Sequence, residues 1–153
     1  MPLLDRLDLH VDVPSLSFDE ISSSVAGERT ADVRARVEVA RRAQHRRAGC
    51  LNALLRPGAL RKQVRLAPEA RALLSHAVDR MGLSGRGHDR VIQIALTVRD
   101  LAEPDAPAKL PVMLGEGHLA EALSYRTLDR TMRALAPSAL PAKSGAVAER
   151  RWR

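Results

Sequence analysis

"APEARALLSHAVDRMGLSGRGHDRVIQIALTVRDLA", residues 67–102, carries the clearest structural pattern in this chain. Two apolar stripes at helical spacing lie on either side of a short Gly-Leu-Ser break. The first stripe is Leu74, Ala77, Val78 and Met81, and the second is Val91, Ile94, Ala95, Val98 and Leu101. Pro68 suits the first turn of a helix, Gly82 suits a helix end, and Ser84 suits an N-cap. The stretch therefore predicts two consecutive helices, over 67–82 and 84–102, that each bury one face.

Further helices are predicted on both sides of this pair. Residues 30–48 form an amphipathic pattern with Thr30 as N-cap and Gly49 as the end, and its stripe is Val33, Val37, Ala40 and Gln44. Pro57-Gly58 indicates a turn before one short helix within 52–66. After a connection over 103–112, residues 115–126 predict another helix, which runs on through Leu128 and Met132.

The N-terminus shows a different period. In "LLDRLDLHVDVP", residues 3–14, apolar Leu7, Leu9, Val11 and Val13 alternate with polar residues, and a proline follows. This alternation predicts one β-strand, whose partners must come from another part of the protein. The fold class is thus mainly α: a helical bundle preceded by one β-strand. The predicted division is a strand over 1–16, a linker over 17–29, a helical domain over 30–135 and a disordered basic tail over 136–153.

Composition limits the kind of protein. The 153 residues include three aromatic residues and one cysteine, so the core is built from Ala, Leu and Val, and no internal disulfide can form. We find neither a signal peptide nor a run of 18 apolar residues. We therefore expect no membrane association and a cytoplasmic location.

Positive charge is concentrated in one segment. The net charge is +7, and 22 of the 25 basic residues are arginine. Residues 28–65 hold eleven basic residues and three acidic ones, a difference of +8 that accounts for the whole excess. Clustered arginine indicates contact with phosphate groups. The candidate contacts to non-specific DNA are Arg34, Arg41, Arg42, Arg46 and Arg47; the alternative is a solvated helix face.

Five blocks together resemble a known family. "LLDRLDLHVDVP", "VRARVEVARRAQHRR", "LNA", the stretch from Leu60 to Ala102 and "HLAEALSYRTLD" follow the order and spacing of the C-terminal part of ComM-like (YifB) proteins. These are AAA+ ATPases of the magnesium-chelatase type. The resemblance covers residues 3–130 and implies a helical AAA+ lid, a homo-hexameric ring, and ATP-dependent DNA remodelling in branch migration, recombination and transformation. It also implies that the chain starts within the ATPase core, whose last strand would be residues 7–13.

The resemblance assigns roles to individual arginines. Arg6 matches the arginine finger, which reaches the nucleotide of a neighbouring subunit and stabilises charge on the transferred phosphoryl group. Arg86 matches the sensor-2 arginine, which contacts nucleotide bound by its own subunit, and Arg90 is the alternate candidate. From the residues alone, Arg6 also fits a surface pair with Asp5, and Arg86 an ordinary first-turn side chain.

The chain lacks a phosphate-binding loop. Such a loop has the pattern G-x-x-x-x-G-K-[ST], and no lysine here lies in it. ATP and Mg²⁺ therefore belong to the full-length family, and we expect no cofactor and no ATPase activity for this chain alone. The histidine spacing predicts no metal site. A second function class stays open: a stand-alone basic helical module that binds nucleic acid or a protein partner. Tetrapyrrole metal insertion is a third, with no residue that marks it.

Overall fold

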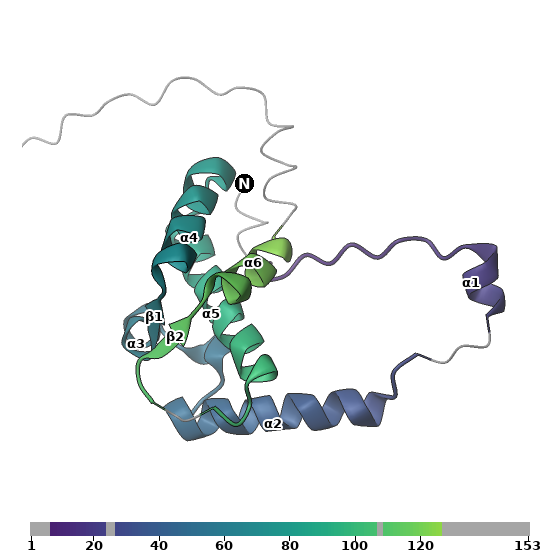
Figure 1. Cartoon of the computed structure of the whole chain (residues 1–153), viewed down its shortest axis with the longest axis horizontal. Helices are drawn as coiled ribbons and strands as arrows, with labels where there is room; N and C mark the ends of the chain where they lie inside the picture. The colour runs from purple at the N-terminus through teal and green to yellow at the C-terminus, as the bar shows by residue number, and fades with distance from the viewer. Residues whose placement is uncertain (1–6, 24–26, 107–108, 127–153) are drawn as a thin grey trace, which may run out of the picture.

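The computed structural model describes residues 7–23, 27–106 and 109–126. A short helix α1 (Phe18–Ser22) precedes the long helix α2 (Thr30–Ala48). A 3₁₀ turn η2 (Asn52–Leu54), helix α3 (Pro57–Gln63) and strand β1 (Val64–Leu66) follow, and then helices α4 (Pro68–Met81) and α5 (Gly85–Ala102). Strand β2 (Val112–Leu114) and helix α6 (Glu116–Ser124) complete the order (Figure 1). The prediction of a mainly helical fold is confirmed.

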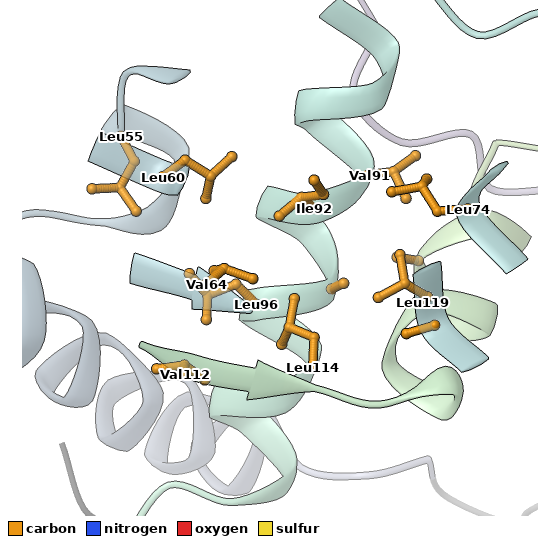
Figure 2. Close-up of a cluster of buried hydrophobic side chains, with 13 residues drawn as sticks. Leu55, Leu60, Val64, Leu74, Val91, Ile92, Leu96, Val112, Leu114 and Leu119 are labelled. Carbon is orange, nitrogen blue, oxygen red and sulfur yellow. The ribbon is translucent and has the colours of Figure 1, made fainter. Parts of the chain in front are cut away.

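Helix α5 forms the centre of the domain. It packs against α6 and α2 and contacts η2 and α3. Its residues Val91, Ala95 and Leu96 have no solvent exposure. Figure 2 shows how Leu55 and Leu60 lie on one side of α5, while Leu74 and Leu119 lie on the other. The core is therefore built of aliphatic side chains on both sides of one helix, as the shortage of aromatic residues requires.

A small parallel sheet closes one side of this core. Val64 pairs with Val112, Arg65 with Met113 and Leu66 with Leu114. Val64, Val112 and Leu114 are buried, whereas the middle residues Arg65 and Met113 point to solvent. The sequence did not predict this sheet, because strands of three residues are too short for their alternation to be distinguished from loop.

The residues predicted to form the N-terminal strand do not form one in the described part of the chain. Residues 7–17 run without helix or ladder, and Leu7, Leu9, Val11 and Val13 are exposed. The reason is that no strand of the described residues lies beside them, and alternation alone does not hold a strand. Within the predicted linker, residues Phe18–Ser22 form the short helix α1, which lies apart from the bundle (Figure 1). A capping box between Ser17 and Glu20 stabilises its N-terminus.

The main helices agree with the prediction to within one or two residues. Gly49 and Gly82 end α2 and α4 in the left-handed conformation, with φ of 70° and 61°. Ser84 caps α5: its Oγ accepts a hydrogen bond from the Gly87 N–H at 3.1 Å. Thr30 is not the N-cap of α2, since the helix already includes it and Arg29 stands at the cap without a side-chain bond.

Two further details differ from the prediction. Pro57-Gly58 begins α3 rather than forming a turn before it. In α2, Ala40 and Gln44 are buried, but Val33 and Val37 are 38% and 41% exposed because the first half of this helix extends beyond the bundle (Figure 1). Leu128, Met132 and the tail over 136–153 lie outside the described residues. No helix in the described part of the chain is long and apolar enough to cross a membrane.

Candidate nucleotide-contact site and basic surface

A cleft of about 430 Å³ opens beside the start of α5. Leu55, Pro57 and Leu60 form its apolar side, contributed by the η2–α3 segment. The polar side comes from the N-terminal part of α5, with Arg86, Asp89, Arg90 and Gln93. Both candidates for the sensor-2 arginine therefore line one cleft at the positive end of a helix dipole, a place suited to an anionic group.

Arg90 is held by contacts within the domain. Its Nε lies 2.9 Å from Oδ1 of Asp8, and its Nη1 donates to Oε1 of Gln93 at 2.9 Å. Gln93 is itself fixed, because its Nε2 donates to the carbonyl oxygen of Leu55 at 2.8 Å. A guanidinium with these partners is a structural group of the cleft wall.

Arg86 is different. Its side chain is exposed, and no other described residue forms a hydrogen bond or ion pair with it. It lies in the first turn of α5, where its charge opposes the helix dipole and gains nothing from it. Of the two candidates, Arg86 is therefore the one whose guanidinium is available to a phosphate in the cleft.

The segment that follows Arg6 is attached to the same region. The backbone N–H of His10 donates to the carbonyl oxygen of Tyr125 at 2.7 Å. Nη1 of the buried Arg126 donates to the carbonyl oxygen of Leu7 at 3.2 Å, and Asp8 reaches Arg90. Arg6 itself lies outside the described residues, so its role as a finger stays a prediction.

The arginines of α2 do not form one uniform set. Arg47 is buried: its guanidinium donates to both carboxylate oxygens of Asp100, each at 2.6 Å, and to Oδ1 of Asn52 at 2.8 Å. The inclusion of Arg47 among the DNA contacts is therefore corrected, because its charge is already neutralised inside the domain. Arg42 is exposed but lies 4.0 Å from Glu38.

Three of the predicted contacts keep an unpaired charge. Arg34, Arg41 and Arg46 are exposed, and no hydrogen bond or ion pair with another described residue engages them. Arg36, on the same helix, is paired with Glu28, and this bond holds the pKa of the Glu28 carboxyl below its ordinary value. The basic face of α2 is thus partly neutralised by its own acidic residues.

Sequence reasoning missed several polar residues that shape the site. Asp8 and Gln93 fix Arg90, while Asn52 and Asp100 bind Arg47 and Thr97 accepts a hydrogen bond from Asn52. A signal was present, since Gln93, Thr97 and Asp100 follow one another at spacings of four and three and so share a helix face. Among the described residues, no group of three or more His, Cys, Asp or Glu side chains could hold a metal ion.

Comparison with known proteins places these features in a family. The family described as "Magnesium chelatase, subunit ChlI C-terminal" matches residues 27–126. Competence protein ComM of Haemophilus influenzae is 33% identical over 135 residues, which are 88% of this chain and 25% of that protein. The uncharacterized protein YifB of Escherichia coli is 34% identical over 132 residues, or 86% of this chain and 25% of YifB. An uncharacterized protein of Mycobacterium tuberculosis is 37% identical over 129 residues, or 82% and 24%. The chain spans about a quarter of the length of these curated relatives.

Proposed function

The chain belongs to the family of magnesium chelatase ChlI-type C-terminal domains, and from this premise we propose that it acts as the helical lid of a ComM-like AAA+ ATPase. In this role it works joined to an ATPase core that carries the phosphate-binding loop. ATP with Mg²⁺ is then the substrate of the whole assembly, and this domain supplies positively charged groups from one side of the nucleotide.

The observation that carries the proposal is the unpaired Arg86 at the cleft. Its guanidinium is exposed in the first turn of α5, on a helix whose start is fixed by the Ser84 cap. A cation held on a rigid helix can stabilise the charge of a terminal phosphate and can report its loss after hydrolysis. The neighbouring Arg90 keeps the cleft wall in place through Asp8 and Gln93.

We place the ATPase in DNA remodelling, of the branch-migration type used in recombination and transformation. The similarity to a competence protein and the excess of unpaired arginine support this choice. Arg6 would serve as the finger that acts on the nucleotide of the next subunit in a homo-hexamer. Exposed arginines of the lid would contact DNA phosphates without reading sequence.

A fusion experiment tests the proposal. The chain is joined to an ATPase core of the family that lacks its own lid, and ATP hydrolysis and branch migration of a four-way DNA junction are measured. We expect hydrolysis well above that of the core alone, and we expect Arg86→Ala to abolish most of the gain. Arg80→Ala, which removes another exposed arginine from α4, serves as the control and should leave the rate unchanged. A fusion no more active than the bare core would refute the lid role.

The competing function is a basic module that binds nucleic acid without nucleotide. This alternative is favoured by Arg34, Arg41 and Arg46 of α2, which have no partner among the described residues. The fusion distinguishes the two, because a module of this kind would bind DNA equally well whether or not Arg86 is present and would not raise hydrolysis.

A further inference from the structure

A second hollow, of about 320 Å³, lies on the other side of the contact between α3 and α5. It shares only Leu60 and Asp89 with the cleft of Arg86. Three arginines from three successive elements line it: Arg61 from α3, Arg65 from β1 and Arg71 from α4. We call this hollow the basic groove. Nothing in the proposed lid role accounts for it.

The arginines of the basic groove carry unneutralised charge. Arg61, Arg65 and Arg71 are exposed, and within the described ranges no carboxylate pairs with any of them. The only acidic side chain in the lining, Asp89, is engaged with Nδ1 of His88 at 3.1 Å. The segment from Arg56 to Arg71 holds five basic residues, including Lys62, and a single acidic one, Glu69. This contrasts with α2, where Arg36, Arg42 and Arg47 each have an acidic neighbour.

The fold is what brings the three arginines together. Pairing of β1 with β2 turns Val64 and Leu66 toward the core, so the intervening Arg65 must point outward. Arg61 belongs to the last turn of α3, and Arg71 to the second turn of α4, on either side of β1. The floor of the groove consists of the buried Leu60, Val64 and Ile92. The three guanidinium groups are therefore held around a rigid apolar surface.

The chemistry of the groove favours a phosphate backbone over a protein. Protein interfaces depend on apolar or aromatic anchors at their centre. Most of the large hydrophobic side chains that are exposed among the described residues lie elsewhere, on segments such as 7–21, and Met113, the sheet partner of Arg65, is the exposed one beside the groove. Guanidinium groups match phosphate oxygens at two points, and three of them with a single carboxylate, Asp89, in the lining suit a polymer of regularly spaced phosphates.

We propose that the basic groove binds the phosphate backbone of a nucleic acid, with Arg61, Arg65 and Arg71 as the contacting side chains. The proposal rests on the DNA role suggested above and names the surface that performs it. The groove, and not α2, supplies the larger share of the affinity. No Phe, Tyr or Trp side chain lines the groove, and the imidazole of His88 is bonded to Asp89, so we expect binding that depends on neither base sequence nor stacking.

The test compares two triple variants of the whole chain that remove equal charge. The groove variant removes the three positive charges of the basic groove by Arg61→Gln, Arg65→Gln and Arg71→Gln. The α2 variant removes the three unpaired arginines of α2 by Arg34→Gln, Arg41→Gln and Arg46→Gln. Affinity for a labelled 30-base-pair duplex of mixed sequence is measured by fluorescence anisotropy from 50 to 200 mM salt. Circular dichroism melting checks that both variants fold.

We expect the groove variant to lose at least tenfold in affinity at low salt, and the slope of log K against log salt to fall by about three. The α2 variant should lose no more than about threefold, as expected for charges that act only at a distance. Equal losses in both variants, or a larger loss in the α2 variant, would overturn the proposal while leaving the DNA role intact. Poly-glutamate is also added as a competitor at the same concentration of negative charge as the duplex. If it displaces the duplex, the groove would be assigned to an acidic protein instead. A wild-type chain without affinity for DNA would refute both the groove and the DNA role, whereas the fusion experiment would still test the lid.

Discussion

Arg47 of α2 and Asp100 of α5 form a two-point ion pair in the interior of the domain. Nη1 lies 2.6 Å from Oδ1 and Nη2 lies 2.6 Å from Oδ2, and the two side chains are 3% and 0% exposed. Nδ2 of Asn52 donates to Oδ2 of Asp100 at 2.9 Å, and the backbone N–H of Asn52 donates to Oε1 of Gln44 at 3.1 Å. This network links α2, the η2 turn and α5, and so fixes how the long helix crosses the bundle.

Removing one member of this pair should destabilise the domain strongly. Arg47→Ala leaves the Asp100 carboxylate buried without its main partner, which costs about 3–5 kcal/mol in comparable buried pairs. We expect a loss of this size in the free energy of unfolding, measured by urea denaturation. The control is Arg46→Ala, one residue earlier and exposed, which should change stability by less than about 0.5 kcal/mol. A loss below 1 kcal/mol for Arg47→Ala would show that water or another group replaces the guanidinium.

The long helices were predictable because local rules define them. Apolar residues recur at helical spacing, Ser84 caps α5, and Gly49 and Gly82 end their helices, so each boundary has a cause within a few residues. The β1–β2 sheet was not predictable in this way, since its pairing joins Val64 to Val112 across α4 and α5. The alternation of residues 7–13 is also clear, but a strand needs partners, and none of the described strands lies beside these residues.

The candidate site shows the same difference between features set by local sequence and features set by distant contacts. That Arg86 follows the cap of α5 could be deduced from the sequence, but that Asp8 holds Arg90 depends on a contact between residues 82 positions apart. Arg46 and Arg47 look alike in the sequence. Only Arg47 continues the buried positions of Ala40 and Gln44 at spacings of four and three, a signal that an interpretation based on charge alone ignores.

The Asp8–Arg90 pair should add a small contribution to the attachment of the N-terminal segment. Asp8→Asn removes the charge that faces Arg90, while the hydrogen bond from His10 to Tyr125 remains as a reporter. Because the side chain of Asp8 is 45% exposed, solvent screens the pair and its contribution is small. We therefore expect the amide of His10 to exchange about two- to fivefold faster in hydrogen-exchange NMR. Asp12→Asn is the matched control, since the exposed Asp12 has no ion-pair partner in the described ranges. Identical exchange in both variants would mean that Arg126 and the backbone bond hold the segment alone.

The carboxyl of Glu28 should have a pKa below its ordinary value. The hydrogen bond from Arg36 lowers the pKa of its carboxyl, so the folded state binds this proton less readily than the unfolded chain does. Its contribution to stability is therefore complete above the ordinary glutamate pKa and is lost as the pH falls through the lowered pKa. Carboxyl-carbon NMR titration should show the pKa of Glu28 return toward the ordinary value in Arg36→Ala but not in Arg34→Ala. An unchanged titration in Arg36→Ala would show that the pair does not persist in solution.

The last prediction separates the roles proposed for Arg6 and Arg86, and it uses the chain joined to an ATPase core in a ring. Arg6 is proposed to act on the nucleotide of a neighbour, so Arg6→Ala should leave nucleotide binding nearly intact while hydrolysis falls by roughly a thousandfold or more. Arg86 is proposed to act on nucleotide held by its own subunit, so Arg86→Ala should also weaken the response of the lid to nucleotide.

Mixing the two variants in one ring then provides a test that neither single variant gives. At some interfaces a subunit with an intact finger meets a subunit with an intact Arg86, and these interfaces should recover part of the activity. The comparison is with rings of each variant alone, assayed by ATP hydrolysis at the same total concentration. If the mixture is no more active than either variant, the assignment of one arginine across the interface and the other within the subunit is wrong. Full activity in either single variant would return that arginine to the role of an ordinary surface charge.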